Sequence, residues 1–426
     1  MEISSWVPAG ADTGTGFGLA NLPYGVFSRR GELPRVGVAI GAYVLDLAEL
    51  AAAGLIDDHR WFAAGSLNGF MLAGRPAWTA NRDRLTELLG DESHRSAVEP
   101  HLVPRDEVAL HLPIEVADYV DFFSSLDHVT NAGRIFRPDG DPVPPNWRHL
   151  PVAYHGRAGT VVVSGTPVAR PYGQRVRPGD TLPSYGPSDM LDFEAEVGFV
   201  VATPASGPIP PSAFRAHVFG FVLVNDWSAR DIQRWESRPL GPFLGKSFAT
   251  SISPWVVPVA ALEAARVIPP PQDPPPLDYL RCAEPWGLDL SLTVELNGEP
   301  IARPEFRSMY WTPPQQLAHA TINGASVRPG DLFASGTVSG REKRQRGCLL
   351  ELTWDGAEPL ELTGGARRTF LEDGDTVVIS ATAPGPNGTT LSLGEVTGTV
   401  QGSQRRMGVD EGGGDGGQAF PAAGEA

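Results

Sequence analysis

Two acidic residues, Glu194 and Glu196, stand at the start of an apolar run that reads VGFVVA over residues 197–202. This run predicts a strand, and because side chains alternate along a strand, the two carboxylates would share one face. Like charges on one face of a core strand repel each other unless a cation lies between them, and Mg²⁺ and Ca²⁺ prefer carboxylate oxygens. The alternative is a solvent-exposed strand end that binds nothing, and this pair alone does not decide between the two.

A second acid lies at the end of another apolar run. The run FGFVLV over residues 219–224 predicts a buried strand, with Asp226 two residues past it and Arg230 shortly after. Binding and catalytic residues are frequent where a strand gives way to a loop, which favours a functional role. Asp226 could equally cap the turn or helix that follows.

A histidine follows an acidic segment nearer the N-terminus. The stretch DYVDFFSS over residues 118–125 places Asp121 shortly before His128. An imidazole close to a carboxylate suits a general base beside a metal ligand. The chain has nine histidines, and most of them will be structural or exposed, so this motif alone assigns no role.

The lysine Lys246 stands in the segment LGPFLGKS over residues 240–247. The segment looks superficially like a phosphate-binding loop. That loop requires glycine where Leu240 stands, and Pro242 has no backbone N–H to offer a phosphate, so we reject this interpretation. The lysine then either stabilises a developing anion in an apolar site or extends to solvent.

Motifs and charge argue against several classes of protein. The sequence contains no H-E-x-x-H or G-x-S-x-G motif, and no G-x-G-x-x-G follows a predicted strand, which disfavours zinc proteases, α/β-hydrolases and dinucleotide enzymes. A net charge of −16 makes nucleic acid an unexpected partner. No apolar run approaches the roughly 18 residues of a membrane span, and the start of the chain does not resemble a signal peptide. We therefore expect no membrane contact and a cytoplasmic protein.

The elements that must position these residues are short. Glycine and proline number 49 and 41, which favours many turns and short strands over long helices. Residues 1–116 mix strand and helix patterns, with a helix expected over residues 81–89, and predict a small separate domain. Short β-branched runs between turn residues predict one large β-rich domain over residues 117–402. The Gly-rich, acidic residues 403–426 predict a disordered tail.

Nine segments, taken together and in order along the chain, resemble the fumarylacetoacetase family. The most specific are NDWSARDIQRWE over residues 225–236 and PLGPFLGKSFATSISPWVVP over residues 239–258. The other segments are NLPYGVF (21–27), DYVDFFSSLDH (118–128), LPVAYHGRA (150–158), VVVSGTPV (161–168), LDFEAEVGF (191–199), MYWTPPQQLAH (309–319) and RPGDLFASGTVSG (328–340). The resemblance extends to about residue 400, and the tail has no counterpart in it.

The resemblance implies a mainly β fold, in which a small N-terminal SH3-like barrel precedes a β-roll catalytic domain. It also implies a homodimer, Mg²⁺ and/or Ca²⁺ as the cofactor, and a small diacid as the substrate. The reaction it implies is the metal-dependent hydrolysis of the carbon–carbon bond of 4-fumarylacetoacetate to fumarate and acetoacetate. This is the last step of tyrosine and phenylalanine catabolism.

The resemblance also assigns roles to individual residues. The cation falls to Asp121, Glu194, Glu196 and Asp226, with Lys246 and Thr250 beside it. The catalytic residues are the general base His128, Glu351 that orients it, and Arg230, Gln233 and Lys246 that stabilise the oxyanion and the leaving carbanion. The substrate-contacting positions are Phe123, Arg137, Tyr154, Gln233, Ser237 and Thr337.

Two positions depart from the family pattern, which has tyrosine where this chain has Phe123 and Ser237. The chemistry should survive both changes, because the expected ligands, base and lysine all match. The substrate preference is what they affect, since a buried site that loses a hydrogen bond can change its preference by a large factor. The alternatives are therefore a hydrolase or isomerase of another β-diketone or acylpyruvate-type acid on the same fold, and a metal- or acid-binding protein without catalysis.

Overall fold

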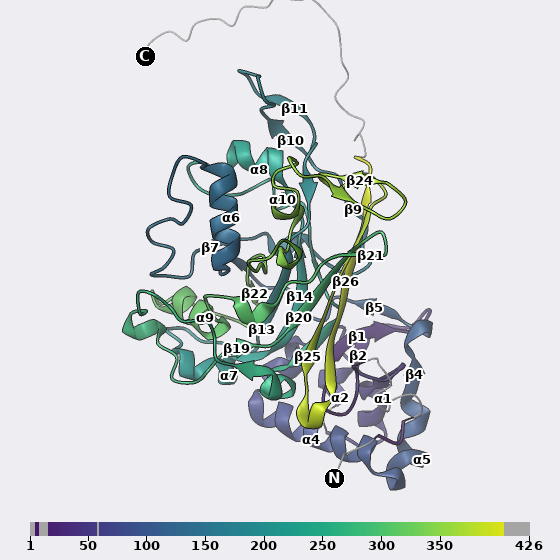
Figure 1. Ribbon diagram of the computed structural model, residues 1–426. Coiled ribbons are helices and arrows are strands. Elements are labelled where there is room, and N and C mark those ends of the chain that lie inside the picture. Colours follow the sequence, from purple (N-terminus) through teal and green to yellow (C-terminus); the bar gives the residue numbers. More distant parts are fainter. Residues whose placement is uncertain (1–4, 8–15, 58, 404–426) are drawn as a thin grey trace, which may run out of the picture.

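The computed structural model describes residues 5–7, 16–57 and 59–403 of the chain (Figure 1). The expected mainly β class is confirmed, and the predicted tail lies outside the described residues apart from Ser403. The largest sheet joins 13 strands. These strands are β1 (Tyr24–Ser28), β2 (Arg35–Ile40), β3 (Tyr43–Asp46), β4 (Leu102–Pro104), β5 (Ala109–His111), β6 (Tyr119–Phe122), β7 (Ala153–His155), β8 (Val161–Val163), β13 (Ala195–Val201), β14 (Val218–Asp226), β16 (Thr250–Ile252), β17 (Trp255–Pro258) and β22 (Leu332–Ala334).

A second sheet of five strands crosses the larger part of the molecule, with the long β25 and β26 running along it in Figure 1. Its members are β9 (Val168–Ala169), β20 (Ser291–Leu296), β21 (Glu299–Ala302), β25 (Thr376–Pro384) and β26 (Thr390–Gln401). The remaining strands form two-stranded pairs: β10 (Tyr172–Arg175) with β11 (Ser184–Pro187), β12 (Leu191–Asp192) with β15 (Ser228–Ala229), β18 (Arg266–Val267) with β19 (Gly287–Leu288), and β23 (Leu360–Glu361) with β24 (Arg367–Arg368).

The α-helices are short and surround the sheets. Those of the N-terminal part are α1 (Leu47–Ala52), α2 (His59–Phe62), α3 (Asn68–Leu72), α4 (Arg75–Gly90) and α5 (Arg95–Val98). Those of the larger part are α6 (Leu126–Phe136), α7 (Phe214–His217), α8 (Arg230–Glu236), α9 (Pro313–Thr321) and α10 (Leu349–Leu352). The helix expected over residues 81–89 forms the second half of α4. Among the described residues, no helix has the length and apolar character needed to cross a bilayer.

The expected N-terminal SH3-like barrel is not confirmed. Within the described residues, the strands β4, β3, β2 and β1 follow one another in an open sheet that closes into no barrel. The sheet instead continues into the larger part of the molecule, because β1 pairs with β17 through Tyr24 opposite Val256. Opposite β2, strand β1 is shared between two partners: its last three residues pair with β5 of the N-terminal part and its first two with β17.

The two parts of the chain also share apolar contacts. Phe219 of β14 lies among three aromatic rings of the N-terminal part, with ring centroids 5.4 Å from Tyr24, 5.8 Å from Phe70 and 5.3 Å from Trp78. Aromatic side chains bury large apolar areas, so this contact stabilises the docking of the two parts. The division into residues 1–116 and 117–402 stays a prediction.

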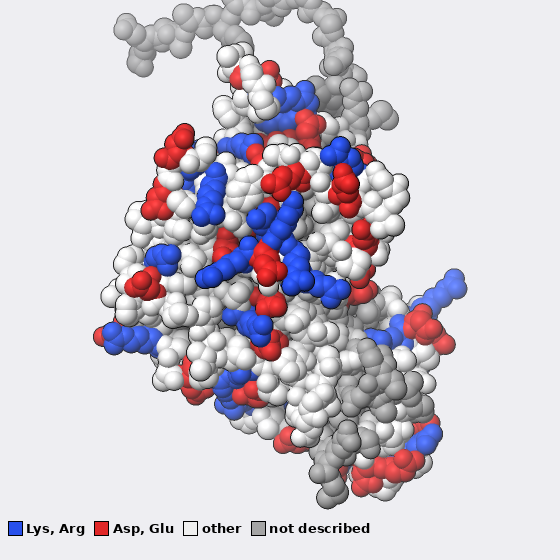
Figure 2. All heavy atoms as spheres, viewed as in Figure 1, with Lys and Arg blue, Asp and Glu red and all other residues white. Residues whose placement is uncertain are grey.

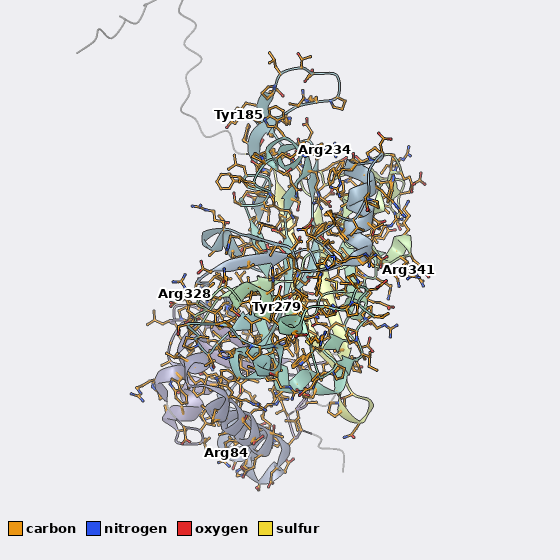
Figure 3. All side chains as sticks on the ribbon, turned by 90° about the vertical axis from the view of Figure 1, so that its left-hand side faces the viewer. Arg84, Tyr185, Arg234, Tyr279, Arg328 and Arg341 are labelled. Atoms are coloured by element: carbon orange, nitrogen blue, oxygen red, sulfur yellow. The ribbon has the colours of Figure 1, made fainter. Side chains whose placement is uncertain are left out.

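The outer surface is mixed in charge. On the face in Figure 2, acidic and basic side chains lie close together rather than in large patches of one sign. Figure 3 shows the two ends of the molecule, with Tyr185 on the projecting β10–β11 hairpin and Arg84 of α4 at the opposite end. The hairpin side chain Tyr185 is 76% exposed, so an aromatic ring faces solvent there.

Candidate active site

Four carboxylates meet at the centre of the large sheet. The strand order β14-β13-β22-β6 brings together Asp226 at the end of β14, Glu196 on β13 and Asp121 on β6, with Glu194 directly before β13. Each of the four residues offers one oxygen that lies within 4.8 Å of the others, and all four side chains are buried. Burial excludes the solvent-exposed strand end that the sequence left open for Glu194 and Glu196.

The four carboxylates of this acidic cluster repel one another, and a cation bound between them would offset that repulsion. Burial, followed by the repulsion of neighbouring carboxylates, raises the pKa of Asp121 and of Glu196 well above the ordinary value. Asp121 Oδ1 and Glu196 Oε1 are buried and have no hydrogen-bond partner among the described residues. Buried acceptors are costly without a partner, and several carboxylate oxygens facing one point are what a hard divalent cation binds. The residues present therefore fit such an ion.

Glu196 is held in place by a glycine that follows β22. The Gly336 N–H donates to Glu196 Oε2 over 3.0 Å. Gly336 has a positive φ of 77°, and a Cβ there would lie 2.1 Å from the Phe122 carbonyl oxygen. Only glycine adopts this conformation at low cost with the backbone of β6 so close.

A buried lysine and a tyrosine hold the acidic cluster together. Lys246 Nζ donates to Glu194 Oε2 and, over 2.8 Å, to Asp226 Oδ2. The Tyr154 hydroxyl, which has one proton to donate, lies 2.7 Å from Asp226 Oδ2 and 3.0 Å from Asp121 Oδ2, while Thr250 Oγ1 donates to Asp226 Oδ1. Burial alone would lower the pKa of Lys246, but the charges of Asp226 and Glu194 outweigh it and raise that pKa. Lys246 is thus a buried cation, and not a lysine that extends to solvent.

A histidine and a glutamate form a hydrogen-bonded pair beside the acidic cluster. His128, in the first turn of α6, lies 2.6 Å through Nδ1 from Glu351 Oε2 on α10. Glu351 also accepts from Asn131 Nδ2 over 2.8 Å and from Ser339 Oγ over 2.7 Å. Burial would raise the pKa of Glu351, but His128 and these donors lower it to about 2. Glu351 is therefore ionised and fixes the orientation of the imidazole.

Asn131 and Ser339 were missed by the sequence reasoning. Asn131 lies one helical turn after His128, and this spacing is a signal that could have pointed to it. Ser339 comes from the segment after β22, more than 200 residues from His128, and no local pattern in the sequence links the two.

An arginine at the first position of α8 connects to the acidic cluster. Arg230 Nη1 donates to Glu194 Oε1 over 2.7 Å and to Gln233 Oε1 over 3.2 Å. Gln233 follows one helical turn later, which is why the two side chains meet. The Gln233 carbonyl is thereby occupied, so its amide N–H₂ remains as a donor for another group.

A cavity of about 910 Å³ opens onto most of these residues. The predicted residues along its wall are Asp121, Phe123, His128, Arg137, Tyr154, Glu194, Arg230, Gln233, Ser237, Lys246 and Thr337. Glu196 and Glu351 lie behind this wall, while Asp226 and Thr250 border a smaller cavity of about 130 Å³ together with Tyr154 and Lys246. The structure thus brings every predicted site residue to one region of the molecule.

Three of the wall residues show what the cavity offers to a ligand. Phe123 contacts the His128 ring edge-on, with the centroids 5.1 Å apart, and has no hydroxyl to offer. Thr337 Oγ1 is buried and has no partner among the described residues, so it is free to bond a ligand. Arg137 Nη2 donates to the Pro142 carbonyl, which ties this cation to the loop after α6.

Comparison with known proteins relates most of the chain to one family. Residues 20–113 match the family model described as fumarylacetoacetase N-terminal, and residues 119–408 match fumarylacetoacetate (FAA) hydrolase C-terminal. The chain is 46% identical over 415 residues to the fumarylacetoacetase of Homo sapiens, covering 93% of this chain and 98% of that protein. It is 44% identical over 423 residues to the fumarylacetoacetase of Arabidopsis thaliana, with the same coverage.

Solved structures agree at the level of the fold. A fumarylacetoacetate hydrolase from Exiguobacterium antarcticum superposes with a TM-score of 0.54 at 17% identity, covering 89% of this chain and 99% of that one. At this identity the likeness concerns the fold alone. The family models and the relatives above 40% identity carry the stronger conclusion: this chain belongs to the fumarylacetoacetase family.

Proposed function

We propose that this protein is a fumarylacetoacetase, a hydrolase that cleaves 4-fumarylacetoacetate into fumarate and acetoacetate. The observation that carries the proposal is that a histidine–glutamate pair, a buried acidic cluster and two buried cations meet at one cavity. In the reaction, the oxygen of water bonds to the carbonyl carbon of the fumaryl group. The carbon–carbon bond to the adjoining methylene then breaks, and the methylene carbon takes up a proton.

His128 is the general base for the attacking water. Its Nδ1 is held by Glu351, so Nε2 is the nitrogen that accepts a proton from water. Because Glu351 is buried and ionised, it stabilises the imidazolium that results, as in other pairs of a base and an orienting carboxylate. The same imidazolium can afterwards return the proton to the leaving carbon.

Arg230 and Lys246 counter the negative charge that develops on the substrate. Both side chains are buried, both contact Glu194 and both border the cavity. Fixed cations in a site that excludes water stabilise a developing oxyanion strongly, and losing one donor typically costs about 10²–10³ in rate. The free amide of Gln233 is a further donor on the same side.

The acidic cluster is the proposed metal site. Asp121, Glu194, Glu196 and Asp226 would hold Mg²⁺ or Ca²⁺, with Lys246 and Thr250 adjacent, and a bound cation would supply a Lewis acid for the carbonyl oxygens of the substrate. The unpartnered oxygens of Asp121 and Glu196 support this proposal. Lys246 pairs with Glu194 and Asp226 and so offsets part of the negative charge of the cluster.

The remaining cavity residues would bind the substrate. A diacid needs positive charge and hydrogen-bond donors, which Arg137 and Thr337 provide along the wall. Tyr154 lines the wall beside them and would contact the substrate, while its hydroxyl donates to the acidic cluster. Phe123 and Ser237 contribute an apolar ring and a small hydroxyl. Because the family pattern has tyrosine at both positions, these two residues favour a second candidate substrate class, another β-diketone or acylpyruvate-type acid.

A turnover assay tests the proposal. Purified protein is mixed with 4-fumarylacetoacetate in the presence of Mg²⁺ or Ca²⁺, and fumarate release is followed before and after EDTA. We expect release that EDTA abolishes and added metal restores. A folded, metal-loaded protein that leaves 4-fumarylacetoacetate intact but turns over an acylpyruvate would overturn the proposed substrate and support the second candidate.

We also propose that the enzyme is a cytoplasmic homodimer. Large apolar side chains are exposed near the cavity, and Leu240, which borders it, is 96% exposed while Phe243 is 64% exposed. Such exposed patches are typical of protein interfaces. Light scattering should give twice the chain mass of 45.4 kDa, and a mass of one chain at micromolar concentration would contradict the dimer.

A further inference from the structure

We propose that Asp192 is a positioning residue that holds two parts of the active site at once. These two halves are Arg230 and the His128–Glu351 pair, and we call the double contact through Asp192 the tie. This inference rests on the proposed function, and it adds to the site a residue to which no role has been given so far. Asp192 is fully buried on β12 and does not border the cavity, so it reaches the reaction only through its neighbours.

The Asp192 carboxylate bonds to both halves of the site at once. Its Oδ2 accepts from Arg230 Nε over 2.9 Å and lies 2.8 Å from Arg230 Nη2. Its Oδ1 accepts from the Leu349 N–H over 2.7 Å, and its Oδ2 accepts from the Leu350 N–H over 3.0 Å. Leu349 and Leu350 are the first two residues of α10. One side chain therefore holds both the arginine and the helix that carries Glu351.

The first half of this tie concerns Arg230. The guanidinium is clamped from two sides, by Asp192 at Nε and Nη2 and by Glu194 at Nη1. A planar guanidinium is directed by such paired contacts more strictly than by a single ion pair. Without Asp192, Arg230 would keep Glu194 as its acidic partner and could turn away from the position that faces the cavity.

The second half concerns the histidine–glutamate pair. The helix α10 has only four residues, and its second to last residue is Glu351. Asp192 accepts the two N–H groups that start the helix, and such groups have no partner inside a helix. If the start of α10 moves, Glu351 moves with it, and the 2.6 Å contact to His128 Nδ1 is lost or lengthened.

The chemistry of this position requires a carboxylate. All the groups that bond to the Asp192 carboxylate are donors: the N–H groups of α10, the Phe193 N–H and the guanidinium of Arg230. Asparagine has nearly the same shape, but its N–H₂ would face these donors and repel them. The variant Asp192→Asn therefore breaks the tie while removing almost no volume.

The test compares Asp192→Asn with the matched control Asp375→Asn. Asp375 is also buried and also pairs with an arginine, Arg368, and with a backbone N–H, that of Glu372. Like Asp192 it does not border the cavity, but neither of these partners belongs to the site. With Mg²⁺ saturating and metal content checked, we expect Asp192→Asn to lower kcat on 4-fumarylacetoacetate about 10²-fold, the cost of a misplaced catalytic group. The KM of Asp192→Asn and the kcat of Asp375→Asn should both stay close to wild type.

Double variants show whether Asp192 acts through the two groups named. In the Arg230→Gln and Glu351→Gln backgrounds, Asp192→Asn should each time add only part of its 10²-fold loss, because one of the two groups that it positions is already gone. In the Asp375→Asn background it should cause the full loss. A full 10²-fold loss in all three backgrounds would overturn the tie.

A spectroscopic readout needs neither substrate nor turnover. The His128 Nδ1 proton bonded to Glu351 should give a far-downfield resonance in wild type, identified by its absence in His128→Ala. It should shift or broaden in Asp192→Asn and stay in place in Asp375→Asn. If Asp192→Asn does not fold, Asp192→Ser, which leaves room for water, takes its place in every measurement.

The outcomes separate this inference from the proposed function. No turnover by wild type would overturn the function, and the resonance would still report on the tie. Wild-type turnover with an unchanged kcat and an unchanged resonance in folded Asp192→Asn would overturn the role of Asp192.

Discussion

The site contains two groups of buried side chains that could each hold a metal, and they differ in how their oxygens are used. His128, Cys348 and Glu351 bring potential ligand atoms within 4.8 Å of one another, as the four acids do. In the first group the atoms bond to each other: Glu351 accepts from His128 Nδ1 and from Cys348 Sγ. In the acidic cluster, oxygens of Asp121 and Glu196 are left without partners.

The difference in pKa follows from this contrast. Donors lower the pKa of Glu351 to about 2, whereas burial and like charges raise those of Asp121 and Glu196. A carboxylate that already has its donors is a fixed anion that can orient a base. Carboxylates that repel one another need a cation from outside. The two groups therefore have separate tasks, and separate changes should affect them.

The largest expected effect separates the base from the metal site. His128→Ala should lower kcat about 10³-fold, within the range expected for removing a general base, while the bound metal stays at the wild-type level. The matched control is His217→Ala, since His217 bonds to the Thr203 carbonyl and does not border the cavity. Activity close to wild type in His128→Ala would remove this histidine from the mechanism.

The next effect concerns the charge of Glu351. Its folded pKa of about 2 lies below the ordinary 4.5, so its ionised form stabilises the fold above about pH 4.5, and this contribution disappears as the pH falls toward 2. The contribution is about 3 kcal/mol. Urea unfolding of EDTA-treated protein between pH 6 and pH 3 should thus show a shallower acid loss for Glu351→Gln than for wild type. Parallel curves would contradict the lowered pKa.

A smaller effect is that of Glu196→Gln on the free energy of unfolding, and its sign should reverse when metal is added. In EDTA-treated protein at pH 7, Glu196→Gln replaces a buried carboxyl group that faces other acids and whose Oε1 has no partner, so it should raise the free energy of unfolding by about 1–2 kcal/mol. With Mg²⁺ or Ca²⁺ present, wild type gains the binding energy and should become the more stable of the two. A variant that is less stable under both conditions would show that Glu196 is satisfied without a cation.

Sequence patterns predicted some of this arrangement and could not predict the rest. Alternation along one strand was enough to place Glu194 and Glu196 together, because that rule is local. The approach of Asp121 depends on the parallel pairing of β22 with β6, where Ala334 stands opposite Asp121. No local pattern encodes that register, so only the family resemblance brought Asp121 into the set.

The N-terminal part shows the same limit. Its strand and helix patterns were visible in the sequence, but the barrel is not confirmed, and the pairing of β1 with β17 from far along the chain could not be predicted from a local pattern. Asp192 stands in the segment over residues 191–199 that resembles the family, and the sequence predicts no role for it. Its partners Arg230 and Leu349 lie 38 and 157 residues away, so its contacts could be seen only in the folded chain.

Calorimetric titration of Mg²⁺ and Ca²⁺ into EDTA-treated protein tests the central contrast most directly. Wild type and His128→Ala should bind one ion per chain with the same affinity, while Glu194→Gln, which removes one ligand charge, should bind at least about tenfold more weakly. Equal binding by wild type and Glu194→Gln, or weaker binding by His128→Ala, would contradict the assignment of the metal to the acidic cluster.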